Sequence, residues 1–200
     1  MSNQPATQNA NNNNGEQAVF GTYARLMMLM NVERYNQDTS IKAAILESRL
    51  TRSQNALNES EKLLKQLKHT QAIIRDNLTS IVSVRPRTNT TPLPPNLPIW
   101  EKRHSTFDGE MGPLETKHQE QVTLFQNLMK KHKEHDKSPK SYAELITHFT
   151  GLENNLIKLR KHLRTLLSQV TQLNNEVASH TGSSAPALTQ ASTLTGPNQG

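Results

Sequence analysis

Apolar residues between positions 145 and 177 recur in alternating steps of four and three. All ten positions of this run are apolar: Leu145, Phe149, Leu152, Leu156, Leu159, Leu163, Leu166, Val170, Leu173 and Val177. A straight α-helix has about 3.6 residues per turn, so a repeat of about 3.5 stays on one face only when helices wind around each other. Ser141 and Glu144 form a capping box just before the run. The pattern predicts a helix over residues 141–179 that packs against a partner helix.

A second run with the same spacing follows Asp38, a residue suited to the N-cap of a helix. Eight of its eleven positions are apolar: Leu46, Leu50, Leu57, Leu64, Leu67, Ile74, Leu78 and Ile81. The other three are polar, and polar residues at such positions help to select register or partner: Ser53, Ser60 and Gln71. Pro86 disfavours helical geometry in the residue before it, so this helix is expected to end near Val84.

Five segments are expected along the chain. Residues 85–113 contain six of the ten prolines, which predicts an extended linker between two helical halves. The Asn- and Gln-rich start and the low-complexity end have little apolar surface to bury and are expected to be disordered. The expected parts are a disordered tail (1–15), an N-terminal helical region with a short amphipathic helix and the heptad helix (16–84), a Pro-rich linker (85–112), a C-terminal helical hairpin or coiled coil (113–180) and a second disordered tail (181–200).

Two of these parts have further distinctive features. The short amphipathic helix over residues 16–34 has an apolar face rich in Met, whose flexible thioethers suit an adaptable docking surface. Pro113 is suited to the first turn of a helix that ends at the basic residues 130–133. The loop over residues 134–140 is short enough to fold that helix back antiparallel to the next one.

The composition favours the same fold class. Hydrophobic residues make up 33% of the chain, below the roughly 45–50% that is usual in globular domains. Burial is therefore expected along narrow helical seams, which predicts an all-α, elongated coiled-coil or helical-hairpin protein with disordered tails. The chain has no Cys, no apolar run long enough to span a membrane and no secretion signal at its start. It is expected to be intracellular, cytoplasmic or nuclear.

No residue pattern indicates catalysis, a metal or a cofactor. His132 and His135 are three residues apart, whereas a zincin helix needs His at four residues apart with Glu between them. These histidines and the lysines around them are expected to form a solvated helix end. The prolines between Pro92 and Pro98 have PxxP spacing without the flanking basic residue of a typical ligand, so they are interpreted as a spacer. Trp100 is expected to pack on a neighbouring helix or a partner.

The expected function is that of a non-enzymatic structural or interaction subunit of a multi-protein complex. The apolar positions of both runs would bind protein helices, either of other subunits or of a second copy. Two-part, leucine-seamed chains with polar tails resemble in general style the small subunits of eukaryotic kinetochore, transcriptional-mediator, nucleoporin and vesicle-tethering assemblies, and secreted bacterial effectors and phage proteins share this pattern.

Two alternatives remain open at this stage. The net charge of +6 would suit a basic helical protein that associates with nucleic acid. However, the charge is spread thinly and forms one local cluster at residues 130–133, so nucleic acid is not expected to be the primary partner. The other alternative is a secreted effector or adaptor that binds a partner helix.

Overall fold

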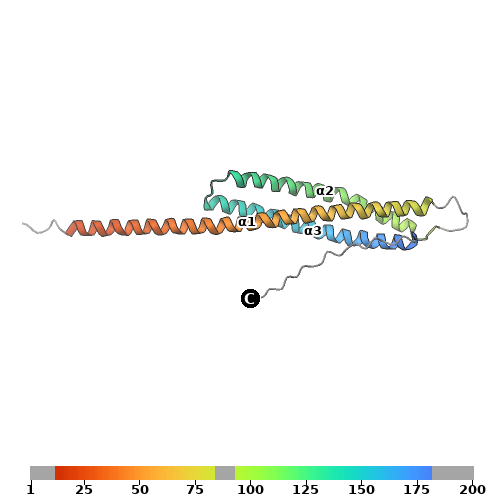
Figure 1. Ribbon diagram of the computed structural model, residues 1–200, viewed down its shortest axis with the longest axis horizontal. Helices are drawn as coiled ribbons and strands as arrows, with labels where there is room; N and C mark the ends of the chain where they lie inside the picture. The colour runs from red at the N-terminus through yellow and green to blue at the C-terminus, as the bar shows by residue number, and fades with distance from the viewer. Residues whose placement is uncertain (1–11, 84–92, 182–200) are drawn as a thin grey trace, which may run out of the picture. The chain divides into compact units, whose positions relative to one another are not determined.

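The computed structural model describes residues 12–83 and 93–181, with side chains from residue 21 onward, as an all-α fold (Figure 1). Its helices are α1 (Asn12–Ser83), α2 (Leu97–Glu134) and α3 (Pro139–Thr181), and this described part contains no strand. The all-α prediction is therefore confirmed. Most residues of the expected disordered tails, 1–11 and 182–200, lie outside the described residues, as do residues 84–92 of the expected linker. Residues 12–15 belong to α1, so the prediction of a disordered tail is wrong for them.

Helix α1 is continuous where the sequence predicted two helices. Asp38 does not cap a second helix; it lies inside α1 and accepts a 2.8 Å bond from the Lys42 ammonium one turn later. No proline occurs between the two predicted helices, so nothing breaks the backbone hydrogen bonding there. The end of α1 at Ser83 agrees with the prediction of an end near Val84.

Helix α2 begins at Leu97, so the prediction of an extended linker is wrong for residues 97–112. The Asn96 carbonyl accepts hydrogen bonds of 3.0 Å from the backbone N–H groups of Ile99 and Trp100, which starts the helix. Pro98 lies in the first turn, where a missing N–H breaks no helical bond. Pro113 lies inside α2 instead of at its start.

A third heptad run explains why α2 passes through Pro113. Residues at alternating steps of three and four face inward or lie half-buried along and just beyond α2: Leu97, Trp100, His104, Phe107, Met111, Leu114, His118, Gln121, Phe125, Leu128, His132 and His135. Met111 and Leu114 on either side of Pro113 are 7% and 2% exposed. Their burial offsets the one hydrogen bond that proline removes.

The described chain forms two compact units. Unit 1 contains α1 up to Gln54 and residues 124–153. Unit 2 contains the described residues from Asn55 to Thr123 and from Asn154 to Thr181. In unit 1 the core is made by α1, the end of α2 and the start of α3, and the rings of Phe125 and Phe149 meet edge to face at 6.1 Å. In unit 2 the core takes Leu, Ile and Val from α1 and α3. Helix α2 contributes Leu97, Trp100, Phe107, Met111 and Leu114 to it.

Ion pairs within unit 2 define the direction of its helices. Between α1 and α2, Lys68 pairs with Glu115 at 3.0 Å and Arg75 with Asp108 at 3.3 Å, so these segments are antiparallel. Helices α2 and α3 are also antiparallel, as shown by the pairs Arg103–Glu176 at 2.6 Å and Glu110–His162 at 3.7 Å. It follows that α1 and α3 run parallel in this unit, with α2 as the return between them.

The turn between α2 and α3 is capped within unit 1. The Ser138 hydroxyl accepts a 3.1 Å bond from the Ser141 N–H, and Pro139 takes the first helical position, so α3 starts before the predicted capping box. Asp136 accepts a 2.9 Å bond from the Ser138 N–H. Hydrogen bonds from Ser138 and Ser141 lower the pKa of Asp136 to about 2.

The polar positions of the α1 seam are buried within the chain. Ser53 and Ser60 are fully buried and Gln71 is 3% exposed. Ser60 donates to the Ala56 carbonyl at 2.8 Å, one turn earlier in its own helix. Neither polar atom of the Gln71 amide has a hydrogen-bond partner within the described chain. This amide therefore opposes folding by its desolvation.

Replacing this amide should stabilise the protein. We expect Gln71→Leu to raise the free energy of unfolding by about 1–2 kcal/mol, because it removes a buried unpaired polar group at similar volume. Urea unfolding followed by the fluorescence of the single tryptophan, Trp100, measures this. Gln66→Leu, at a half-buried position of the same helix, controls for the change in helix propensity. Destabilisation by Gln71→Leu would show that the amide is hydrogen-bonded in solution.

Candidate interaction surface

The residues predicted to bind a partner are largely buried by the chain itself. All ten positions of the α3 run are buried. Six apolar positions of the α1 run are buried as well, and two are half-buried: Leu46, Leu57, Leu64, Leu67, Ile74 and Leu78, then Leu50 and Ile81. The helices that these seams require are therefore supplied within one chain. Binding of another protein through these positions stays a prediction, and their burial does not require it.

Truncating a residue of the α3 seam should destabilise the folded chain. Leu166 is 1% exposed and belongs to the core of unit 2. We expect Leu166→Ala to lower the free energy of unfolding by about 2–5 kcal/mol, through lost burial and the cavity left behind. Chemical denaturation provides the measurement, with Ile157→Ala at a 57% exposed position of α3 as the control. Equal, small losses in both variants would contradict the burial of Leu166.

The first part of α1 in unit 1 is a large apolar surface that no helix of the described chain covers (Figure 1). Every residue from 21 to 38 is exposed. Met28 and Leu29 are 70% and 67% exposed, far from the burial expected of such side chains. We call residues 26–32 the apolar segment; its members with exposed apolar side chains are Leu26, Met27, Met28, Leu29, Met30 and Val32.

The apolar segment is apolar on all sides of the helix. Successive residues of an α-helix are about 100° apart, so six apolar residues out of seven surround the axis. A helix that is hydrophobic all round is normally buried, in a protein core or in a membrane. Within the described residues no helix is both long enough and apolar enough to cross a membrane.

Charged residues flank the apolar segment on both sides. Arg25 precedes it, and Glu33 and Arg34 follow it. All three are exposed, and none forms an ion pair with another described residue. Arg25 and Glu33 are eight positions apart, about 12 Å along the helix axis, which is too far for a direct pair within one helix. These charges are available to a partner.

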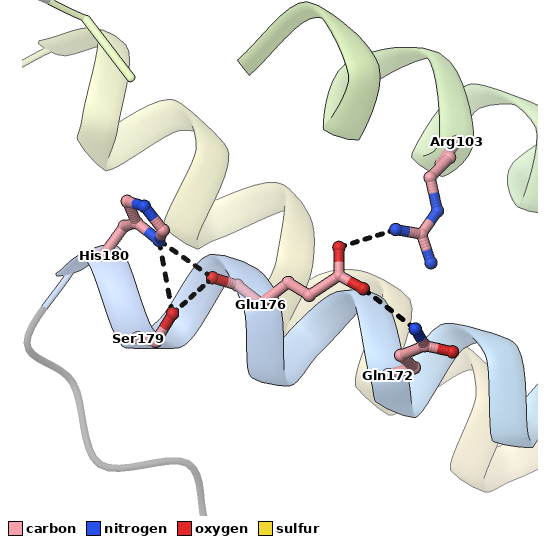
Figure 2. A network of polar contacts seen from close by, with 5 residues as sticks. All are labelled: Arg103, Gln172, Glu176, Ser179 and His180. Carbon is pink, nitrogen blue, oxygen red and sulfur yellow. Dashed lines mark hydrogen bonds and ion pairs between the residues drawn. The ribbon is translucent and has the colours of Figure 1, made fainter. Parts of the chain in front are cut away.

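A polar network in unit 2 joins the start of α2 to the end of α3 (Figure 2). Arg103 bonds one carboxylate oxygen of Glu176 at 2.6 Å, and the Gln172 amide donates to the other at 3.1 Å. Trp100 is 3% exposed and meets the ring of His180 edge to face at 4.7 Å. The expectation that Trp100 packs on a neighbouring helix is confirmed, and the network is structural, since the chain itself satisfies its charges.

The histidines predicted to form a solvated helix end pack between helices in unit 1. His132 is half-buried and lies 3.2 Å from a carboxylate oxygen of Glu47 on α1. The rings of His132 and His135 stack at 5.2 Å, and His135 meets Tyr142 of α3 edge to face at 4.6 Å. No group of three or more His, Asp or Glu side chains that could hold a metal ion exists among the residues described.

His118 is a half-buried histidine of the α2 seam. Burial lowers the pKa of His118, and the Glu61 carboxylate partly opposes this. Its Nδ1 atom is buried without a hydrogen-bond partner in the described structure. The α2 run was not predicted because five of its positions are His or Gln instead of apolar residues. A heptad pattern that accepts His and Gln at seam positions would have predicted it.

Folding stability should decrease as the pH falls below about 6.5, the ordinary pKa of His. Between that value and the lowered pKa of His118, the unfolded chain binds a proton that the folded chain does not, so acid favours unfolding. We expect His118→Gln to flatten the dependence of the unfolding free energy on pH between about 7 and 5. Denaturation across this range measures it. The exposed His69 of α1 provides the control His69→Gln; equal flattening in both would place the effect outside His118.

Comparison with known proteins gives no match: no family model, curated protein or solved structure is significantly similar to this chain.

Proposed function

We propose that this protein is a non-enzymatic structural subunit that joins a multi-protein assembly through the apolar segment of α1. The packed parts of the three helices act as the scaffold, and the uncovered part of α1 is the binding element. The observation that carries this proposal is the exposure of six apolar side chains around one stretch of helix. Their burial against partner helices would contribute on the order of 10 kcal/mol before the costs of association.

The chemistry of the segment supports a protein partner. Met27, Met28 and Met30 are flexible and polarisable, which suits a surface that adapts to another helix. Only Arg25, Glu33 and Arg34 are charged near the segment, so attraction to a polyanion would be weak there. Association through the apolar segment should change little with salt, whereas binding driven by phosphate contacts should fall steeply.

Removing the apolar surface should release the partners of this subunit. We expect the double variant Met28→Asp with Val32→Asp to lose the proteins that co-purify with the tagged wild type, because both carboxylates would be desolvated in the interface. Affinity purification from the native cell with quantitative mass spectrometry measures this. Ile157→Asp, at an exposed apolar position of α3, is the matched control. Recovery of the same proteins with the double variant would contradict the proposal.

A further inference from the structure

We propose that the apolar segment pairs two copies of this chain antiparallel, with the two-fold axis at Leu29. This inference rests on the proposed function, since it identifies the partner helix as the same helix of a second copy. Three observations support it: the face on which Leu29 lies, the positions of the flanking charges and the length of α1 that remains uncovered.

The face of α1 that carries Leu29 continues the buried seam. Counting back from Leu46 in the same steps of three and four leads through Ala43, Thr39 and Asn36 to Val32 and Leu29. Leu46 is fully buried and Ala43 and Thr39 are half-buried, whereas Leu29 and Val32 are 67% and 56% exposed. Leu26 lies about 60° from Leu29 around the helix and widens this apolar face. The seam therefore continues beyond the part of α1 that α2 and α3 cover. A helix of another chain packed on Leu29 and Val32 would extend the same packing.

The charges favour an antiparallel second copy. When two α1 helices cross antiparallel at Leu29, Arg25 of each copy lies opposite Glu33 of the other, which gives two equivalent ion pairs. Leu26 then lies opposite Val32, and Met28 opposite Met30. A parallel pair in register would instead bring Arg25 to Arg25 and Glu33 to Glu33. The self-complementary pattern is the one that a two-fold interface requires.

The uncovered length of α1 fits the same axis. In an antiparallel pair centred on Leu29, Leu46 lies opposite Asn12, the residue at which α1 begins. Leu46 is the first fully buried residue of α1 among those whose side chains are described. Residues 21–37 are all exposed, so two copies can pair over these residues, about 25 Å of helix, without displacing α2 or α3. The chain's own cover of this face begins at the half-buried Thr39 and is complete at Leu46.

Charge reversal on the purified full-length chain tests the pairing. Analytical ultracentrifugation from about 1 to 100 µM should show a dimer of the wild type. Arg25→Glu and Glu33→Arg should each weaken dimerisation on the order of tenfold, because each places two like-charge contacts in the dimer. The double variant, and an equimolar mixture of the two single variants, should both restore it, since opposite charges face each other again. Failure of this restoration would overturn the antiparallel register.

A second pair of variants tests the face. Leu29→Asp should weaken dimerisation on the order of a hundredfold, because two carboxylates would meet on the two-fold axis. Met27→Asp, which lies about 160° away on the opposite side of the helix, is the control and should have little effect. Circular dichroism should show the same helical content in both, since neither residue contacts the core. Equal loss in both variants would overturn pairing through the Leu29 face.

The remaining outcomes separate this inference from the proposed function. A wild type that stays monomeric over the whole range overturns the inference; if the variant Met28→Asp with Val32→Asp still releases co-purifying proteins, the proposed function stands. Co-flotation of the monomer with phosphatidylcholine vesicles would likewise overturn self-pairing, in favour of a membrane surface. A dimer that recovers no other protein supports the inference and contradicts the role as subunit of a mixed assembly.

Discussion

The fold depends on burial along two parallel heptad seams of one chain. Parallel helices cannot be joined by a short turn, so α2 returns antiparallel between them and contributes a third seam. Ten seam positions of α3 are buried, and each fully buried Leu contributes about 1.5–3 kcal/mol. Surface ion pairs such as Lys68–Glu115 contribute at most about 1 kcal/mol each, so they align the helices more than they stabilise them.

The sequence predicted the parts of the fold that follow from uninterrupted periodicity. The α3 helix, the end of α1 and the burial of Trp100 were all predictable, because apolar spacing and a single large aromatic side chain dominate there. The first part of α2, up to residue 112, was mispredicted because the six prolines in residues 85–113 are strong local signals of an extended linker. Their effect is outweighed by the burial of Phe107, Met111 and Leu114, which depends on helices distant in the sequence.

Whether a heptad seam pairs within a chain or between chains cannot be read from its spacing. The same apolar pattern occurs in both arrangements. A seam is buried within its own chain when a later segment of that chain can fold back against it, and otherwise it needs a second chain. Here α2 is long enough to let α3 return to the seam of α1 from Leu46 onward. The first part of α1 lies beyond this cover and stays exposed. The composition of the Met-rich stretch in that part suits a docking surface, but its exposure on all sides could be seen only from the extent of α2 and α3.

The parallel arrangement of α1 and α3 also determines the order in which the chain can fold. Residues that pair between these helices are about a hundred positions apart, as in Arg49–Glu153 and Glu59–Arg164, whereas α2 and α3 are joined by a short turn at Ser138. Loop-closure entropy therefore favours pairing of α2 with α3 next to this turn before pairing of α1 with α3. During synthesis α1 emerges first and must wait several seconds for α3 to be made. Over that interval the polar side chains of Ser53, Ser60 and Gln71 reduce the apolar surface that the nascent helix presents to other chains.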